Sequence, residues 1–492
     1  MKKKLQDIFL FLWAVTTIGC YEDKGNYDYR HLPEVTISGI EDQYTVYVNS
    51  PFRIPATVEV RNGELKEVVY EWIVDGKVIS DQKQLDVIVN FAVKPGLYGQ
   101  YNVIDKSTGI KYIKTFRVDV SSTFMNGWLI LSDLGDKSQL CFMRNDNVFA
   151  ENIYHIANNE YLSGGAFALS EHFLPYNELT GQVFVACQKG PGYSVELDGN
   201  SLQKIIHTEK EFVGGKPADF CPQTMDAVSG WDYMISAGKL YTREVISDEP
   251  QYQEGAFPNI PVEGNYKLSP FTIRGNKVAS DIIISFDELS RSYVLLRNGV
   301  IVNFDYNNDN NKVFKPSNMD KTLLGGGAIQ ALSYPPQDQF LTFLKGDDSK
   351  IYVHQFLFSG WMREKYQSEV QIEFPKPELI NKDTKFAVCS GRDYAYFTSG
   401  NELWVYKYKT NECERLRNDF TGPIREIALC LTNYERLAIA VTNAADASKS
   451  DFMVLDVSVV GRGATVEGTE VIGKCGKVVD IMYKVGSQWD IY

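Results

Sequence analysis

The segment DYAYFTSGNELWVYKYK, residues 393–409, places two strand-like runs rich in aromatic and apolar residues on either side of a Ser-Gly-Asn turn. This pattern predicts a β-hairpin, because glycine and asparagine tolerate the backbone conformations of tight turns. Segments of the same kind recur along the chain with starting points roughly 40 to 60 residues apart, a spacing typical of one β-propeller blade per segment. The six other segments begin at Asn126, Gly181, Trp231, Ser292, Gln339 and Arg436.

The last apolar run, KVVDIMYKVG at residues 477–486, has no hairpin partner of its own. We expect it to complete the first blade and close the ring, which removes exposed strand edges. Residues 124–492 are therefore predicted to form one propeller of about seven blades, with six or eight as neighbouring counts. Two successive sandwiches or a long barrel are the alternatives, but the only candidate boundary in this region is VEGNYKLSPF at residues 262–271.

Residues 33–122 have a different pattern, with seven short alternating runs separated by turns. That pattern is typical of an antiparallel sandwich of immunoglobulin type, so the predicted fold class is all-β throughout. Within VVYEWIVDGK, residues 68–77, Trp72 shares a strand face with Tyr70 and Val74 and is interpreted as the core tryptophan.

The N-terminus carries a targeting segment. Three lysines precede the apolar run IFLFLWAVTTI at residues 8–18, and Gly19-Cys20 follows it. This is a secretory signal peptide, too short to span a bilayer as a helix. Its ending resembles that of a bacterial lipoprotein signal, which implies that residues 1–19 are removed and that Cys20 is the lipid attachment site. The alternative is an ordinary signal peptide with an incidental cysteine.

The run CYEDKGNYDY, residues 20–29, and the sandwich that follows resemble the PKD-like family of surface lipoproteins of Bacteroidetes-type bacteria. Residues 20–32 would then be a tether, and the acids after Cys20 resemble an export signal to the cell surface. The resemblance implies a lipid anchor in the outer membrane and a SusC/SusD-type transporter as partner. It implies a binding or accessory role in uptake of a glycan or peptide, with the sandwich as spacer or docking domain.

Composition and motifs exclude several classes of function. The chain has 50 basic and 63 acidic residues, a net charge of −13 and no basic stripe, which argues against nucleic-acid binding. The five histidines are isolated and no nucleotide, dinucleotide or hydrolase motif occurs, so no metal, cofactor or catalytic residue is assigned. The sequence favours binding over catalysis. A propeller-based glycoside hydrolase or lyase, with carboxylates that meet only in space, is the alternative.

Candidate ligand-binding residues come from aromatic rings in loop-like sequence, because exposed rings can stack on sugars or clamp a partner. These are Tyr161, Tyr193, Tyr252 and Tyr266. Four acids are interpreted as turn or loop residues, namely Asp219, Asp226, Asp232 and Asp287. The glycines at residues 325–327 are interpreted as a turn, and the Asp/Asn-rich run at residues 304–312 as a turn in preference to a calcium loop.

Seven cysteines follow Cys20, widely scattered and without a C-x-x-C pair. They are neither a disulfide framework nor a zinc site, and several lie in apolar runs where a thiol behaves as a small core residue. A compartment outside the inner membrane would still permit one disulfide.

Overall fold

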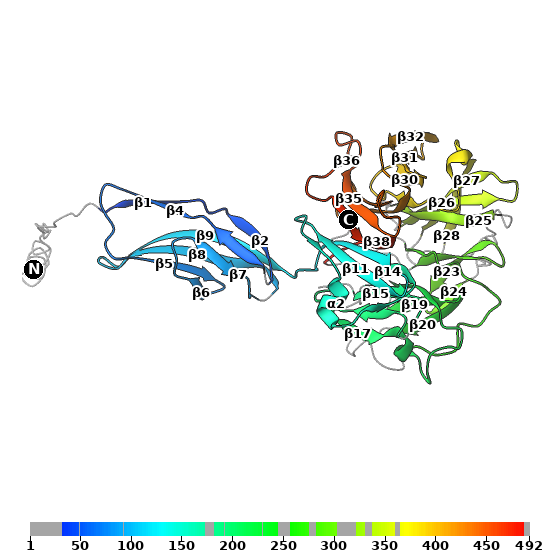
Figure 1. The fold of residues 1–492 in the computed structure, drawn as a ribbon, viewed down its shortest axis with the longest axis horizontal. Coiled ribbons are helices and arrows are strands. Elements are labelled where there is room, and N and C mark those ends of the chain that lie inside the picture. The colour runs from blue at the N-terminus through cyan, green and yellow to red at the C-terminus, as the bar shows by residue number, and fades with distance from the viewer. Residues whose placement is uncertain are drawn as a thin grey trace, which may run out of the picture. The chain divides into compact units, whose positions relative to one another are not determined.

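The computed structural model describes residues 32–48, 50–91, 93–172, 182–190, 192–228, 230–244, 256–274, 282–302, 321–329, 337–359 and 365–486. Cys20, the signal peptide, Tyr252 and the run at residues 304–312 lie outside these residues. The chain divides into two compact units, Met1–Ser121 and Ser122–Tyr492 (Figure 1). Within the described ranges, no helix has the length and apolar character needed to cross a membrane.

The first unit is a β-sandwich. Its larger sheet has the strand order β2-β9-β8-β5-β6, and two two-stranded sheets, β1-β4 and β3-β7, complete it. All pairs are antiparallel except β2 with β9. The strands are β1 (Glu34–Ser38), β2 (Gln43–Tyr47), β3 (Pro51–Ile54), β4 (Thr57–Arg61), β5 (Val68–Val74), β6 (Lys77–Ser80), β7 (Leu85–Ile88), β8 (Lys94–Asp105) and β9 (Ile110–Ser121).

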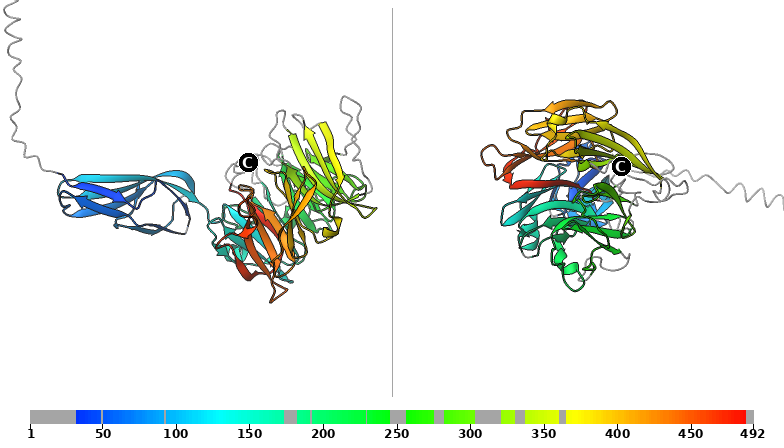
Figure 2. Two further views of the ribbon diagram at one scale, coloured as in Figure 1. Left: turned by 90° about the horizontal axis from the view of Figure 1, so that it is seen from above. Right: turned by 90° about the vertical axis from the view of Figure 1, so that its right-hand side faces the viewer.

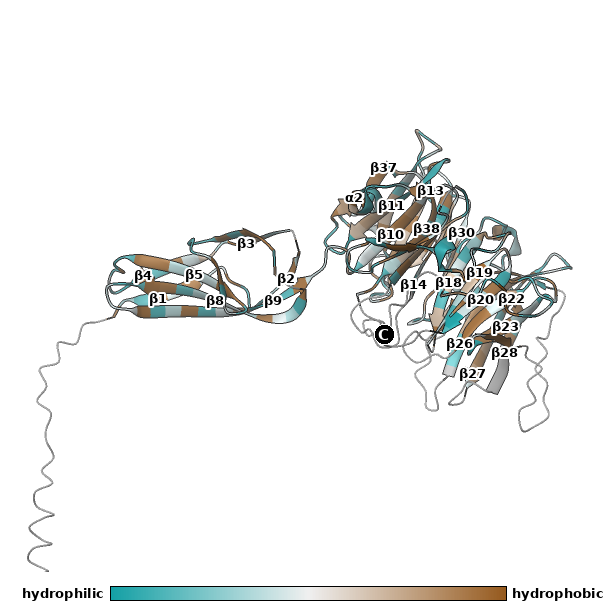
Figure 3. Ribbon diagram, turned by 90° about the horizontal axis from the view of Figure 1, so that it is seen from below, coloured by the Kyte–Doolittle hydropathy of each residue, from teal (hydrophilic) through white to brown (hydrophobic). Residues whose placement is uncertain are grey.

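Trp72 lies at the centre of the sandwich core, as predicted. Its side chain is fully buried and stacks on Tyr101 with ring centroids 4.1 Å apart, while Phe116 meets it edge-on. The indole Nε1 donates a 2.9 Å hydrogen bond to the Gln82 carbonyl, so burial leaves no polar atom of the ring unsatisfied. Hydrophobic and hydrophilic residues alternate along these strands, since only one face of each sheet is buried (Figure 3).

The second unit is a propeller of seven sheets in the described residues. The predicted hairpins are confirmed, because each forms an antiparallel pair in a different sheet. Blade 1 contains β10 (Gly127–Asp133), β11 (Lys137–Arg144), β12 (Phe149–Ala150) and β13 (Leu162–Ser163). Blade 2 contains β14 (Ala166–His172), β15 (Gln182–Cys187), β16 (Val195–Leu197) and β17 (Lys204–His207). Blade 3 contains β18 (Pro222–Val228), β19 (Trp231–Ser236) and β20 (Lys239–Glu244).

The remaining blades follow the same order from the centre outward. Blade 4 contains β21 (Ile273–Arg274), β22 (Ile283–Asp287), β23 (Ser292–Arg297) and β24 (Val300–Val302), and blade 5 contains β25 (Lys321–Ile329), β26 (Gln337–Gly346), β27 (Ile351–Ser359) and β28 (Lys365–Glu373). Blade 6 contains β29 (Phe386–Val388), β30 (Tyr394–Ser399), β31 (Glu402–Lys407) and β32 (Glu412–Arg417). Blade 7 contains β33 (Ile424–Leu429), β34 (Arg436–Thr442), β35 (Ser450–Asp456), β36 (Ala464–Thr465) and β37 (Val471–Cys475). Short helical segments are α2 (Ile153–Asn158), η1 (Thr208–Glu211) and η2 (Pro377–Leu379).

The last strand, β38 (Lys477–Lys484), closes the ring as predicted. It pairs antiparallel with β10 and becomes the innermost strand of blade 1, with Ile130 opposite Ile481. In Figure 2 this red strand lies beside the cyan strands of the first blade. The innermost strands β14 and β33 of the two adjacent blades contact it. The chain therefore begins and ends the propeller in one sheet.

Apolar side chains fill the spaces between neighbouring blades. Seven hydrophobic clusters each combine residues of two adjacent blades, which completes the circle. Trp128 lies between blades 7 and 1, and Trp404 between blades 5 and 6, both at most 9% exposed. These aromatic residues are core residues, and the polar groups that could contact a ligand lie elsewhere.

Candidate functional site

A cavity of about 430 Å³ lies at the centre of the propeller. Its walls come from the innermost strands β14, β18, β21, β25 and β38, which belong to five different blades. A volume of this size is typical of sites for small molecules. Since strands 300 residues apart in sequence contribute to it, the cavity exists only when the ring is closed.

Arg274 and Asp226 form the principal ion pair of this cavity. Arg274 Nη1 lies 3.2 Å from Asp226 Oδ1 and donates a 2.6 Å hydrogen bond to the Ala227 carbonyl. The side chains are 8% and 16% exposed, so the pair is held in a largely desolvated setting. It presents a cationic donor next to an anionic acceptor on one wall.

Three buried polar atoms of residues that line the cavity lack a hydrogen-bond partner among the described residues. They are Ser170 Oγ on β14, Arg274 Nε on β21 and Glu171 Oε1, which belongs to the ion pair with Lys484 described below. Leaving a buried polar group unsatisfied costs about 1–3 kcal/mol, and native structures rarely retain one without a water, ion or ligand to satisfy it. Ser170 Oγ and Arg274 Nε therefore mark the part of the cavity where a polar ligand would gain most.

Asp480 contributes a carboxyl from the closing strand. Its Oδ2 accepts a 2.6 Å hydrogen bond from Leu169 N–H and its Oδ1 a 2.8 Å bond from Ile481 N–H. Burial, and next the charge of Glu426, raises the pKa of Asp480 to about 7. Glu426 on β33 is itself paired with Lys385 at 2.6 Å, yet burial raises its pKa too. Asp480 can thus both donate and accept a proton near neutral pH.

Glu171 is a further acidic residue of the cavity wall, and the ammonium group of Lys484 compensates its charge. Its Oε2 accepts from Val485 N–H at 3.1 Å, and its Oε1 lies 3.5 Å from Lys484 Nζ. Both side chains are at most 1% exposed, and burial lowers the pKa of Lys484. Every ionised side chain on the wall thus has an opposite charge or a raised pKa, so the cavity is polar without a large net charge.

The glycine run at residues 325–327 lies inside β25, so the predicted turn is wrong. A Cβ at Gly326 would lie 2.4 Å from the Leu341 carbonyl oxygen, and one at Gly327 would lie 2.7 Å from Val388 Cβ. Glycine is required because the innermost strand approaches its neighbours too closely for any side chain. The absence of side chains here also leaves Gly326 and Gly327 as a bare wall of the cavity.

Three of the four acids interpreted as turn or loop residues lie in strands, so that prediction is wrong for them. Asp226, Asp232 and Asp287 belong to β18, β19 and β22, and only Asp219 lies in a turn. Asp232 joins Glu196 and Glu211 around Arg243, all with side chains at most 3% exposed. The position of Asp226, Asp232 and Asp287 in strands could not be predicted from the sequence, because a single acidic residue within a strand has no local pattern.

The described tyrosines among the predicted ligand-binding residues do not meet at the cavity. Tyr161 is 52% exposed, but His155 stacks on its ring at 4.0 Å and Lys137 Nζ lies 3.9 Å from its centroid. Tyr193 is half-buried against Phe220. Tyr266 is 6% exposed and donates a 2.6 Å hydrogen bond to the Val262 carbonyl, so it lies in the core and not on an exposed loop.

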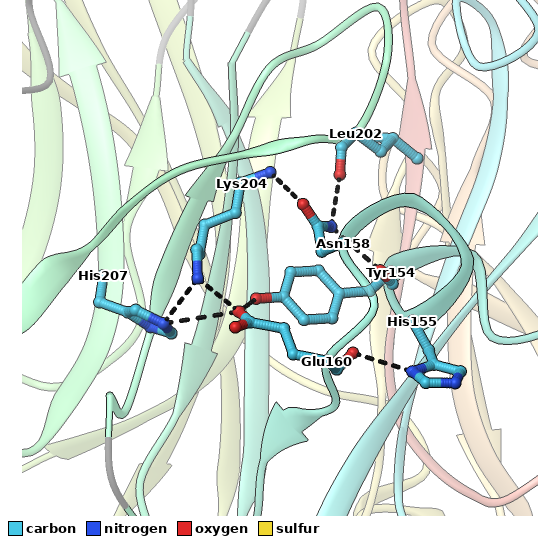
Figure 4. A network of polar contacts seen from close by, with 7 residues as sticks. All are labelled: Tyr154, His155, Asn158, Glu160, Leu202, Lys204 and His207. Carbon is cyan, nitrogen blue, oxygen red and sulfur yellow. Dashed lines mark hydrogen bonds and ion pairs between the residues drawn. The ribbon is translucent and has the colours of Figure 1, made fainter.

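A polar network next to Tyr161 connects α2 to β17 (Figure 4). Lys204 Nζ donates to Glu160 Oε1 at 2.7 Å and lies 3.1 Å from His207 Nε2, and Tyr154 donates its hydroxyl hydrogen to Glu160. Burial and then the Lys204 charge lower the pKa of His207, so the imidazole is neutral and accepts from the ammonium. His207 Nδ1 has no hydrogen-bond partner among the described residues, and the other contacts of the network connect α2 to β17. No metal-binding group of His, Cys, Asp or Glu occurs in the part of the chain that the structure describes.

Comparison with known proteins identifies one family model that matches part of the chain. The model of the PKD-like family matches residues 20–165, which include the sandwich and the beginning of the propeller. The chain matches none of the curated proteins with which it was compared.

Several solved structures resemble the chain in fold. A quinoprotein alcohol dehydrogenase-like protein from Bacteroides thetaiotaomicron has 12% identity and a TM-score of 0.40, over 92% of this chain and 100% of that one. The WD40 domain of Pan2 from Neurospora crassa has 9% identity and a TM-score of 0.37, over 70% and 86%. The Cps50 (Swd1) propeller domain from Myceliophteria thermophila has 9% identity and a TM-score of 0.38, over 65% and 93%. At these identities the similarity concerns the fold alone.

Proposed function

We propose that this protein binds a small saccharide in the central cavity of its propeller. We further propose that it does so as a lipid-anchored subunit of a SusC/SusD-type uptake system at the cell surface. The observation that carries the binding role is the presence of unsatisfied buried atoms on the wall of one cavity, above all Ser170 Oγ and Arg274 Nε. A ligand that supplies partners to both recovers the cost of burying them.

The chemistry of the wall favours hydroxyl groups over ions. A sugar hydroxyl both donates and accepts, so adjacent hydroxyls can accept from Arg274 and donate to Asp226, whose interacting atoms are 3.2 Å apart. The charges of Glu171 and Asp226 are already compensated, which leaves little attraction for the charged termini of a peptide. Phe271 lines the same cavity and provides apolar surface for the C–H face of a sugar ring.

The cellular setting of the proposal rests on the N-terminal sequence. The signal peptide, Cys20 and the acids that follow it support a lipid anchor and surface export, and the PKD-like match at residues 20–165 includes this cysteine. Affinity purification of the lipidated protein from solubilised outer membranes tests the partner. Stoichiometric recovery of a TonB-dependent transporter supports the uptake role, whereas recovery of the protein alone contradicts it.

Titration calorimetry of the full chain tests the binding role. The probes are a panel of neutral monosaccharides and disaccharides, a matched uronic acid series, and dipeptides. We expect saturable heat with one or more neutral saccharides and weaker or no heat with the dipeptides. Binding of the dipeptides alone would replace the saccharide with a peptide ligand, and no heat from any probe would contradict the binding role.

A glycoside hydrolase is the second candidate function, and the carboxyl groups of Asp480 and Asp226, which line one cavity, favour it. Glycoside hydrolysis requires two carboxyl groups, one of which holds its proton near neutral pH, and burial raises the pKa of Asp480 to about 7. Incubation of the full chain with oligosaccharides, followed by an assay for new reducing ends, tests this. Turnover that Asp480→Asn abolishes while binding persists would establish catalysis, and intact oligosaccharides would exclude it for those substrates.

A further inference from the structure

The ring of the propeller closes between blade 7 and blade 1, which we call the seam. No disulfide crosses this seam among the described residues. Blade 1 is completed by β38, which is held to β10 by backbone hydrogen bonds and joined through residue 476 to β37 of blade 7. A closure of this kind depends on one strand from the end of the chain, so its loss would open the ring. Cys141 on β11 and Cys475 at the end of β37 lie on the two sides of this seam.

The Gln139 side chain fixes the segment around Cys475. Its Oε1 accepts a 2.9 Å hydrogen bond from Gly476 N–H, and its Nε2 donates a 3.4 Å bond to the Lys474 carbonyl. These two contacts grip the backbone on both sides of Cys475. Cys141 lies two residues from Gln139 on the same strand, so its side chain points to the same face. Gln139 thus brings the segment that carries Cys475 next to the strand that carries Cys141.

The two thiols meet in a single hydrophobic cluster. Cys141 and Cys475 are 0% and 1% exposed and pack with Val478 and Ile481 of the closing strand. A hydrogen bond with the Cys141 thiol, and next burial, raise the pKa of Cys475 well above its usual range. Cys430 belongs to the same cluster, but its sulfur lies 3.4 Å from the Thr432 hydroxyl. All three cysteines are free thiols in this structure.

We propose that Cys141 and Cys475 form a disulfide that staples blade 7 to blade 1. The two thiols lose two protons and two electrons, an Sγ–Sγ bond forms, and the disulfide of a thiol–disulfide oxidoreductase or of oxidised glutathione is reduced to two thiols. The closed loop would contain almost the entire propeller, and long loops are where a cross-link restricts the unfolded chain most.

We expect the two thiols to be oxidised during folding, before the ring of the propeller is closed. A buried thiol of high pKa is a poor nucleophile and is shielded from oxidants, so exchange must occur before β38 is fully seated. Once formed, the bond is equally shielded from reductants. The disulfide would therefore be a permanent closure and not a reversible switch, and it acts independently of any ligand in the cavity.

Refolding of the full chain in a glutathione redox buffer tests the proposal. Free thiols are alkylated under denaturing conditions, and non-reducing peptide mapping then locates any disulfide. We expect one cross-link, between the peptides of Cys141 and Cys475, with the other six cysteines of the full chain alkylated. Alkylation of both residues, or a cross-link to Cys430, would overturn the proposal. This readout needs no variant, so it holds even if a substitution prevents folding.

Thermal unfolding with and without reductant tests the consequence. The wild type refolded under oxidising conditions should have a Tm several degrees higher than the wild type refolded and kept in the presence of reductant. The double variant Cys141→Ser/Cys475→Ser should show no such dependence. Cys389→Ser is the matched control, because Cys389 is also fully buried but belongs to the cluster between blades 6 and 7. Loss of the reductant effect in this control would overturn the assignment.

Discussion

The sandwich and the propeller differ in how they satisfy buried polar groups. In the described residues between 32 and 121, every buried side-chain nitrogen or oxygen has a hydrogen-bond partner, as Trp72 does with Gln82 and Tyr101 with Lys83. In the central cavity of the propeller, Ser170 Oγ and Arg274 Nε have none among the described residues. The described part of the first unit thus satisfies its buried side chains, whereas the propeller leaves some unsatisfied, in the cavity and also elsewhere, for example at Ser132 Oγ and Ser285 Oγ. Those in the cavity are the ones that the proposed ligand would satisfy.

The contrast separates stability from function. A core whose polar groups are satisfied favours stability, while an unsatisfied wall lowers stability at a place where a ligand can restore it. Substitutions in the sandwich should therefore change stability and leave binding intact. Substitutions in the cavity should change binding more than stability.

Trp72→Ala should have the largest effect, confined to the first unit. Removal of a fully buried tryptophan from a well-packed core costs about 3–5 kcal/mol, enough to unfold a small sandwich or bring it close to unfolding. Limited proteolysis of the full chain should cleave within residues 32–121 and spare the propeller. Calorimetric binding of the saccharide should be unchanged, and a loss of binding would break the proposed separation.

Arg274→Leu should weaken saccharide binding by about tenfold to a hundredfold, since hydrogen bonds to a charged group contribute about 1.5–3 kcal/mol each. Calorimetry measures the affinity. Asp226→Asn combined with Arg274→Leu controls for the carboxylate that the single variant leaves unpaired. An affinity equal to that of the wild type in both variants would place the site elsewhere.

Asp480→Asn should change how stability depends on pH. The pKa of Asp480 is about 7 in the folded state, against a usual value of 3.8, so the folded protein binds more protons and loses stability as pH rises through this window. From about pH 6 to about pH 8 the loss from this group is about 1 kcal/mol. Urea unfolding at both pH values should show a smaller decrease for the variant. A decrease equal to that of the wild type would contradict the raised pKa.

Arg53→Leu should have the smallest effect. Arg53 and Asp86 form a 3.1 Å ion pair in the sandwich with side chains 71% and 66% exposed, and such exposed pairs contribute about 0–1 kcal/mol. The Arg53–Asp86 pair has the same chemistry as the Arg274–Asp226 pair but is exposed, whereas that pair is largely buried. Stability measured by urea unfolding and saccharide affinity should both stay close to wild type, and a large change in either would undermine the role assigned to burial.

Most of the fold could be predicted from the sequence, because hairpins are local. The seven strand–turn–strand segments, the closing strand at residues 477–486 and the core position of Trp72 all follow from patterns within about twenty residues. The glycine run at residues 325–327 is ambiguous in sequence for a related reason. A turn and a crowded strand both require glycine, and only the neighbours Leu341 and Val388 distinguish them.

The cavity could not be predicted, because its residues share no local pattern. Ser170, Arg274 and Asp480 come from β14, β21 and β38, and only the closed ring brings these strands together. The loop-like sequence around the predicted ligand-binding tyrosines does not indicate whether they are buried, and Tyr266 is a core residue. The one available clue was the acid within the closing strand, since Asp480 is the sole charged residue between Lys477 and Lys484.

Hydrogen–deuterium exchange of the full chain, with and without the saccharide that gives the largest calorimetric signal, tests the central claim most directly. The account predicts slower exchange in peptides from β14, β18 and β21, which carry Ser170, Asp226 and Arg274, and no change in residues 32–121. Protection confined to the surface around Tyr161, or to the sandwich, would contradict a ligand site at the centre of the propeller.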